Sequence, residues 1–171
     1  MIDYSKYVRN IPDFPKKGIL FRDITPMLLE HKIFSSLVNE FVKRLKGKNI
    51  DKIVAIESRG FIFGGAIANK LGVGLAIVRK PGKLPFETIK ETYNLEYGKD
   101  SLEIHKDAIK RGEKVVIFDD VLATGGTARA TGKLVRRLGG EVFEYNFLIE
   151  LSSLNGVKKL KGEKVFSLIK F

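Results

Sequence analysis

The chain of 171 residues lacks cysteine and tryptophan and contains only two histidines, His31 and His105. Without cysteine, the protein can form no disulfide, thiol nucleophile or thiolate-ligated zinc site, and two histidines are too few for a multi-histidine metal site. No apolar run approaches the ~20 residues needed to span a bilayer, and the first ten residues have no apolar signal-peptide core. We therefore expect a cytoplasmic protein with no membrane segment, in which both histidines are structural or surface residues.

Positive charge is in excess, with 31 Lys and Arg against 20 Asp and Glu, a formal net charge of +11. Such a surface attracts polyanions, which include nucleic acids and phosphorylated small molecules. A lysine-rich surface is also common in proteins that bind neither, so the charge alone does not choose a partner. The length suits one core, and no repeat or linker interrupts the chain. We predict a single domain over residues 1–171.

Strand and helix patterns alternate after an irregular N-terminal arm. Apolar spacing predicts helices over 33–45, 61–71 and 127–138 and strands over 53–56, 75–78, 115–118, 142–149 and 165–169, with a basic helix before the last strand. This alternation is typical of an α/β fold, with a central, mostly parallel twisted sheet flanked by helices. Two segments break the pattern: residues 1–32 form the arm, and residues 80–113 form an insertion expected to be a lid or hairpin.

The strongest local motif is VVIFDDVLATGGT, residues 115–127. An apolar strand runs into Asp119 and Asp120, and the small-residue loop that follows opens a helix. Ligands of parallel sheets bind at the carboxyl ends of strands. Loop N–H groups, threonine hydroxyls and a helix N-terminus suit a phosphate, whereas paired carboxylates suit sugar hydroxyls or a metal. The Walker A and dinucleotide patterns both fail here. A turn that only caps a helix would need no aspartates, so the motif predicts a phosphosugar site.

This motif resembles the phosphoribosyl pyrophosphate (PRPP) motif of the type I phosphoribosyltransferases. Five further segments resemble the adenine branch of that family and occur in the family's order: FPKKGILFRDITPML (14–28), ESRGFIFG (57–64), RKPGKLP (79–85), YNLEYGKDSLEIHKDAI (93–109) and LIELSSLNG (148–156). The resemblance implies the type I fold, with an N-terminal purine-binding arm and a flexible catalytic loop. It also implies transfer of phosphoribose from PRPP to adenine N9, giving AMP and pyrophosphate. Mg²⁺ would be held mainly through PRPP oxygens, and the protein would be a homodimer.

The same resemblance implies roles for the residues that bind PRPP. Asp119 and Asp120 would take the ribose hydroxyls. The 5′-phosphate would lie on the loop Ala123, Thr124, Gly125, Gly126 and Thr127. Pyrophosphate would lie on Ser58, Arg59 and Gly60, which would follow a cis peptide, and on Arg79, Lys80 and Lys83.

Two more groups of residues complete the implied site. Glu96 would accept the N9 proton of adenine or stabilise the transition state, with Tyr97 beside it and Arg59 as a further catalytic cation. Adenine would lie against Leu20, Phe21 and Arg22, with Leu151 on its other face. Backbone groups near Leu20 and Arg22 would read the 6-amino edge, and a 6-oxo purine, with an acceptor there, would be rejected.

Two other functions are compatible with the PRPP motif. One is a PRPP- or purine-sensing transcription regulator, in which the net charge of +11 would favour DNA binding. Such regulators usually add a DNA-binding domain, whereas the residues before the first long helix carry the purine-site pattern. The other is a 6-oxopurine or xanthine phosphoribosyltransferase, which has no reason to carry LEYG or FRDITP. We therefore expect adenine and PRPP as partners and no nucleic acid.

Overall fold

The computed structural model describes residues 2–94 and 98–171. The chain folds as two compact units, residues 1–44 and 45–171. Among the described residues, no helix is both long enough and apolar enough to cross a membrane.

The N-terminal unit contains more regular structure than the irregular arm predicted from the sequence. Its elements are η1 (Tyr4–Tyr7), β1 (Arg9–Ile11), β2 (Phe21–Asp23), α1 (Thr25–Leu29) and α2 (His31–Leu45), the last residue of which belongs to the second unit. The strands β1 and β2 pair antiparallel, with Asn10 opposite Arg22. The predicted helix over 33–45 is therefore confirmed and begins two residues earlier.

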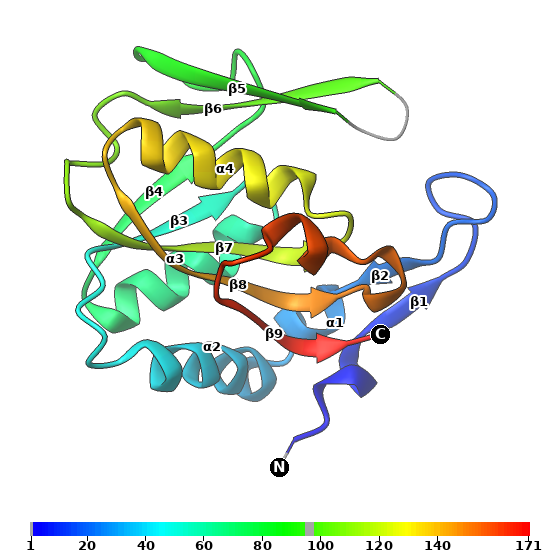
Figure 1. The fold of residues 1–171 in the computed structure, drawn as a ribbon. Coiled ribbons are helices and arrows are strands. Elements are labelled where there is room, and N and C mark those ends of the chain that lie inside the picture. The colour runs from blue at the N-terminus through cyan, green and yellow to red at the C-terminus, as the bar shows by residue number, and fades with distance from the viewer. Residues whose placement is uncertain (1, 95–97) are drawn as a thin grey trace. The chain divides into compact units, whose positions relative to one another are not determined.

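A five-stranded parallel sheet forms the centre of the second unit (Figure 1). Its strands are β3 (Lys52–Ile56), β4 (Gly74–Val78), β7 (Lys114–Leu122), β8 (Glu141–Glu150) and β9 (Val165–Lys170), in the order β4-β3-β7-β8-β9. Every neighbouring pair is parallel. The predicted α/β class with a central parallel sheet is therefore confirmed.

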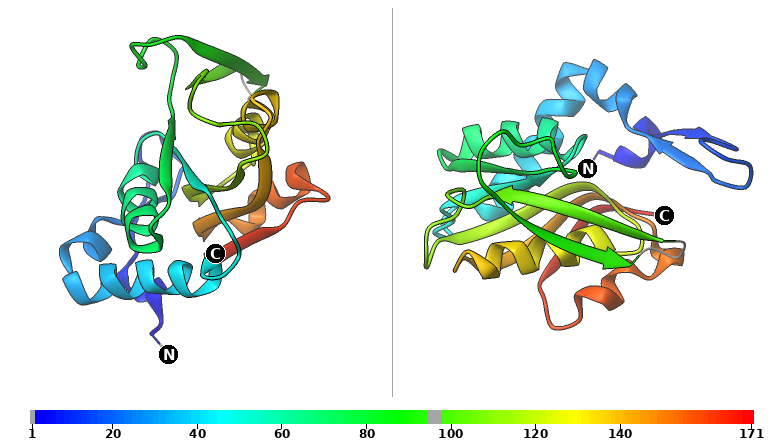
Figure 2. Two further views of the ribbon diagram at one scale, coloured as in Figure 1. Left: turned by 90° about the vertical axis from the view of Figure 1, so that its left-hand side faces the viewer. Right: turned by 90° about the horizontal axis from the view of Figure 1, so that it is seen from above.

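The helices α3 (Gly60–Leu71) and α4 (Gly126–Arg137) pack on opposite faces of this sheet (Figures 1 and 2). Successive strand residues point to opposite faces. On β7, the ring of Phe118 meets Phe63 of α3 at a centroid distance of 6.2 Å. The neighbouring Ile117 instead joins the buried core beneath α4. Helices cover both faces of the sheet. The carboxyl ends of its strands are therefore the place where a ligand would bind.

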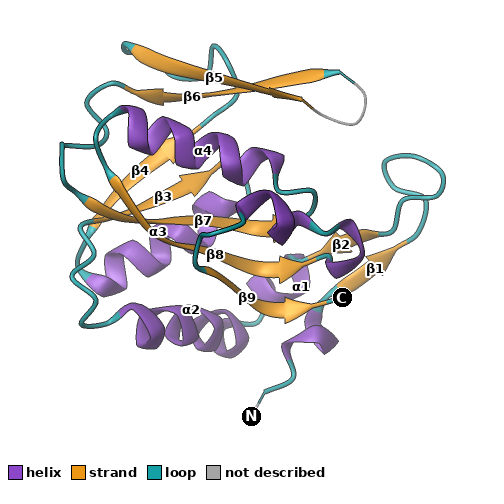
Figure 3. Ribbon diagram, viewed as in Figure 1, coloured by secondary structure: helices purple, strands orange, loops and turns teal. Residues whose placement is uncertain are grey.

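The insertion forms an antiparallel hairpin of β5 (Thr88–Asn94) and β6 (Lys99–His105), apart from the main sheet (Figure 3). The hairpin packs over α4, and Tyr93 stands opposite Asp100 in its register. The extended pieces predicted within residues 80–113 are therefore found.

Two sequence predictions were wrong in detail. The strand predicted over 115–118 continues to Leu122, because Asp119 and Val121 keep their pairing with β8. The aspartates thus lie within the second half of β7 rather than after it. The predicted basic helix after residue 156 is a short 3₁₀ segment, η3 (Gly156–Leu160), preceded by η2 (Ser152–Leu154).

Candidate active site

The two aspartates of the motif face different sides of the end of β7. Asp120 is buried, and its Oδ2 lies 2.6 Å from Nε of Arg59, at the start of α3. Asp119 is partly exposed, and its Oδ1 accepts a 2.9 Å hydrogen bond from the Asp120 N–H. The sheet therefore brings Arg59 and both aspartates together.

The surroundings of this pair disfavour ionised carboxylates. Removal of water raises the pKa of Asp119 well above its ordinary value, and the neighbouring charge of Asp120 raises it further. Burial also raises the pKa of Asp120, although Arg59 opposes that shift. Carboxylates in this condition are stabilised by hydroxyl donors or by a cation that replaces the lost water.

The connection from β3 to α3 approaches the same edge. Its Glu57–Ser58 peptide is cis, as the resemblance implied. A Cβ on Gly60 would lie 3.0 Å from Oδ1 of Asp119 and 3.2 Å from the carbonyl oxygen of Phe118. Glycine at position 60 therefore lets the first turn of α3 pass close to the aspartates.

The loop Ala123–Thr127 surrounds a small hollow of about 60 Å³, lined also by Asp119. The α4 hydrogen bonds start with the Arg129 N–H, which donates to the Gly125 carbonyl, so earlier amides have no helical acceptor. The N–H groups of Thr124, Gly125 and Gly126 donate no hydrogen bond to residues within 2–94 or 98–171. These amides and the helix N-terminus are therefore available to an anion.

Gly156 supports this loop, a role that the sequence reasoning missed. A Cβ on Gly125, where φ is +78°, would lie 2.4 Å from the Gly156 carbonyl oxygen. A Cβ on Gly156 would lie 2.2 Å from the carbonyl oxygen of Ala123. Glycine at both positions lets two backbone segments touch. Only the LIELSSLNG segment, which ends at Gly156, hinted at this contact.

Three cations, Arg79, Lys80 and Lys83, follow β4. Glu57 accepts hydrogen bonds from the Lys80 N–H at 2.8 Å and from Arg79 Nε at 3.2 Å. Burial opposes the charge of Glu57, but these donors outweigh it and hold its pKa below the usual value. The carbonyl of Lys83 accepts from Arg79 at 3.2 Å. Glu57, a residue given no role from the sequence, therefore fixes the backbone that carries the three cations.

The hairpin contributes two residues that the sequence reasoning did not single out, Tyr93 and Asp100. Asp100 is ion-paired with Lys80 and accepts a 3.1 Å hydrogen bond from the Tyr93 hydroxyl. The Tyr93 oxygen also lies 3.2 Å from Oγ1 of Thr127. No sequence signal marks this chain of contacts, because it depends on hairpin register and on packing over α4.

The sequence of this chain matches known proteins. A model of the phosphoribosyl transferase domain fits residues 25–167. The adenine phosphoribosyltransferase of Geobacter metallireducens is 58% identical over the whole of both chains. The chain belongs to the adenine phosphoribosyltransferase family.

Solved structures of this family have the same fold. The enzyme from Thermoanaerobacter pseudethanolicus is 57% identical, with a TM-score of 0.95 over 97% of this chain and 96% of that one. The Saccharomyces cerevisiae enzyme, solved with an imino-altritol bisphosphate and adenine, is 46% identical, with a TM-score of 0.91 over 95% and 94%. The type I phosphoribosyltransferase fold is therefore confirmed.

The remaining predicted residues lie in other parts of the structure. In the N-terminal unit, Leu20 is about half exposed, Phe21 meets Phe14 edge-on at 5.1 Å, and Arg22 donates to the side chain of Asn10. In the second unit, the Leu151 N–H donates to the Leu122 carbonyl at 2.9 Å. Glu96 and Tyr97 lie outside the described residues, so their roles stay predictions.

Proposed function

We propose that this protein transfers the 5-phosphoribosyl group of PRPP to N9 of adenine, giving AMP and pyrophosphate in purine salvage. The observation that carries the proposal is the loop at residues 123–127, where the N–H groups of Thr124, Gly125 and Gly126 have no hydrogen-bond acceptor among the described residues and the hollow is lined by Asp119. An anionic sugar end with neighbouring hydroxyls satisfies both groups at once, because amides donate to phosphate and carboxylates accept from hydroxyls.

The reaction breaks the bond between the ribose anomeric carbon and pyrophosphate and forms a bond from that carbon to N9. The leaving pyrophosphate gains negative charge, which Arg59, Arg79, Lys80 and Lys83 offset together with backbone N–H groups at Ser58 and Gly60. The 5′-phosphate on residues 123–127 and the ribose on the aspartates hold the sugar in line. The proton on N9 would leave to Glu96, with Tyr97 beside it.

Mg²⁺ belongs to the same proposal. Hard oxygen ligands suit this ion, and the second half of β7 supplies the carboxylates of Asp119 and Asp120. Among described residues, no group of three or more acidic or histidine side chains is placed to hold a metal. This donor set fits an ion held mainly by PRPP oxygens, which would neutralise part of the pyrophosphate charge.

Adenine would lie against Leu20, Phe21 and Arg22, with Leu151 on its other face. The partial exposure of Leu20 and Phe21 leaves apolar surface for a ring. Donor and acceptor groups of the backbone near Leu20 and Arg22 would match the 6-amino edge, and a 6-oxo purine would leave one of them unpaired, which disfavours it strongly.

The deciding experiment incubates the protein with PRPP and Mg²⁺ and with adenine, hypoxanthine, guanine or xanthine in separate reactions. We expect AMP from adenine and little product from the others. Turnover of a 6-oxo purine instead would reassign the substrate. No turnover, together with DNA retention that weakens as salt rises, would support the regulator.

The homodimer and the cytoplasmic location inferred from the resemblance and the sequence remain part of this proposal. Sedimentation of the active protein should give twice the chain mass of 19.2 kDa. A monomer with full activity would remove the dimer from the proposal.

A further inference from the structure

A basic groove runs along the outer face of α4, beside the proposed substrate site. It is lined by six cations: Arg129, Lys133 and Arg136 on α4, and Lys158, Lys159 and Lys161 in and after η3. Two adjoining hollows, of about 300 and 500 Å³, share Arg129, Lys133 and Lys159 and so form one continuous surface.

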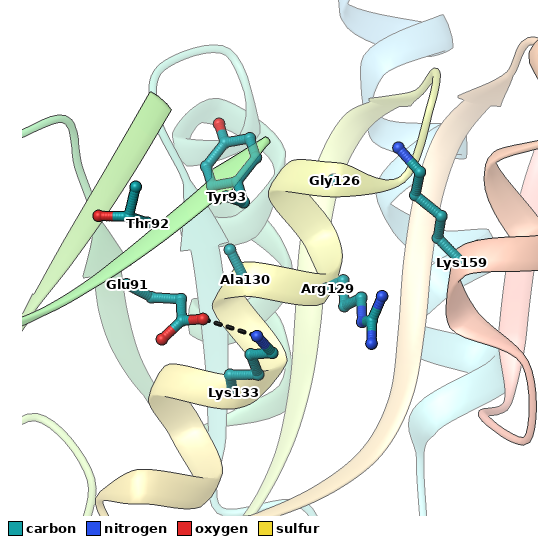
Figure 4. Close-up of a pocket in the computed structure, with 8 residues that line it drawn as sticks. All are labelled: Glu91, Thr92, Tyr93, Gly126, Arg129, Ala130, Lys133 and Lys159. Carbon is teal, nitrogen blue, oxygen red and sulfur yellow. Dashed lines mark hydrogen bonds and ion pairs between the residues drawn. The ribbon is translucent and has the colours of Figure 1, made fainter. Parts of the chain in front are cut away.

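Helical spacing makes the first wall of this groove. Arg129, Lys133 and Arg136 are separated by four and then three residues, so they lie on one face of α4. At 1.5 Å per residue, the row extends for about 10 Å. Figure 4 shows Arg129 extending from α4 and Lys159 reaching toward Gly126 from the facing segment.

Close packing holds the second wall in place. The backbone contact between Gly156 and Ala123 anchors the start of η3 against the loop before α4. Leu160, at the end of η3, is 3% exposed and packs in the core beneath α4. The three lysines therefore project from a fixed segment.

The charges of the groove are largely uncompensated. Lys133 pairs with Glu91 at 2.7 Å (Figure 4), and Arg136 pairs with Glu163 at 2.6 Å. The other four cations, Arg129, Lys158, Lys159 and Lys161, have no acidic partner within ion-pair distance among the described residues. The like charges that line the groove repel one another, and an anion between the walls would relieve that repulsion.

Tyr145 lines one end of the groove and offers no open aromatic face. Tyr145 is 1% exposed, and its hydroxyl lies against the α4 backbone, where a Cβ on Gly132 would be 1.9 Å away. Tyr93, at the other end, is partly buried, and its hydroxyl is bonded to Asp100. Binding of single-stranded nucleic acid relies on bases stacked on exposed rings. The groove therefore suits phosphate groups rather than bases.

We propose that this groove binds a polyphosphate chain, a row of linked phosphates, along α4, at a site that adjoins the substrate loop and is distinct from the pyrophosphate subsite. A single phosphate would engage only part of two facing walls, whereas a chain can run between them. Inorganic polyphosphate and the tail of a nucleoside triphosphate share this chemistry.

The test measures tripolyphosphate binding to the whole protein by calorimetry, in the absence and presence of PRPP, and requires no turnover. The groove variant is Lys158→Ser/Lys159→Ser/Lys161→Ser. The control, Lys46→Ser/Lys48→Ser/Lys70→Ser, removes the same charge from exposed lysines elsewhere in the second unit. We expect two bound chains in the wild type, one in the groove and one at the pyrophosphate subsite that PRPP displaces.

In the groove variant, the site that PRPP does not displace should weaken by about tenfold or more, and the control should keep it within about twofold. KM for PRPP should change little in either variant. Equal affinity for ATP and tripolyphosphate would identify the bare chain as sufficient, and tighter ATP binding would identify the nucleotide as the source. A single site displaced by PRPP, an undiminished site in the groove variant, or binding of a uridine oligonucleotide without tripolyphosphate binding would overturn the proposal.

Discussion

At the scale of single residues, the site depends on polar groups held in unusual surroundings. Asp119 and Asp120 carry raised pKa values because the surrounding protein removes water from their carboxyl groups, and the charge of Asp120 adds to the shift on Asp119. Arg59 compensates Asp120 from 2.6 Å. In the protein without ligand, such groups lower the stability of the fold. They become favourable only when a ligand donates hydrogen bonds to them.

The double variant Asp119→Asn/Asp120→Asn should lose ~10²–10³-fold in kcat, because the ribose loses both charged acceptors. Ionisation of carboxylates with raised native pKa values destabilises the folded state above the unfolded pKa of about 3.9. The variant should therefore have an equal or higher Tm at pH 7. AMP formation and thermal unfolding measure the two effects, and near-normal turnover would contradict the ribose assignment.

Tyr93→Phe tests the contact between the hairpin and the phosphate loop. The Tyr93 hydroxyl donates to Asp100, so its oxygen is left to accept the proton of Thr127. Removing that hydroxyl frees the Thr127 proton for the 5′-phosphate. KM for PRPP should fall by roughly two- to fivefold with kcat nearly unchanged, the size of one ordinary hydrogen bond. A matched Thr127→Val variant should raise KM, and a rise in KM with Tyr93→Phe would show that the hydroxyl binds substrate.

At the scale of elements, close backbone packing and one ion pair hold the strand ends where the site needs them. Gly156 lies against Ala123, and Gly60 lies against Asp119. Lys52 of β3 reaches Glu113, just before β7, at 2.6 Å. Each contact joins segments that are distant in the chain.

Gly156→Ala should displace the phosphate loop, because the new Cβ would lie 2.2 Å from the Ala123 carbonyl oxygen. We expect a loss of ~1–3 kcal/mol in the free energy of unfolding and a raised KM for PRPP. The control is Gly65→Ala on α3, where the nearest atom would be 3.9 Å away. That change should be neutral or stabilise the helix by ~0.5–1 kcal/mol. Unchanged stability and KM in Gly156→Ala would remove the supporting role.

Glu113→Gln should show a pH-dependent loss of stability. Burial opposes the charge of Glu113, but bonding to Lys52 and to the Lys110 N–H outweighs it and lowers the pKa of Glu113. A lowered native pKa contributes stability above the unfolded pKa of about 4.3, and that stability is lost as pH falls through the native pKa. We expect a loss of ~1 kcal/mol at pH 7 and convergence with the wild type near pH ~3.

The control for this prediction is Glu87→Gln, which breaks an exposed pair with Lys106 and should change unfolding little. Denaturant unfolding across the pH range makes the comparison. An equal loss at every pH would show that packing, rather than charge, explains the effect of Glu113.

At the scale of the whole molecule, the net charge of +11 favours anionic ligands. PRPP is a strongly charged substrate and adenine is neutral. Raising KCl from low concentration to ~0.5 M should lower kcat/KM for PRPP several-fold, since salt screens charges beyond a few ångströms. The kcat/KM for adenine, measured at saturating PRPP, should change much less. Equal effects on both substrates would show that salt acts on the protein itself rather than on PRPP binding.

The sequence by itself determined the fold class, the family and the phosphosugar motif. Apolar periodicity and the alternation of strands with helices are local signals, and the loop chemistry of Asp119–Thr127 is contiguous in the chain. The sequence did not determine where the elements end. The strand β7 continues past Phe118 because its pairing with β8 outweighs the polarity of the aspartates.

Only the tertiary structure decided which distant groups meet. The Arg59–Asp120 pair, the support of Ala123 by Gly156, and the contacts from Lys80 through Asp100 and Tyr93 to Thr127 join residues from separate elements. Two walls of cations likewise form one groove only when η3 packs beside α4. These contacts depend on register, helix packing and glycine-sized clearances, which no short stretch of sequence encodes.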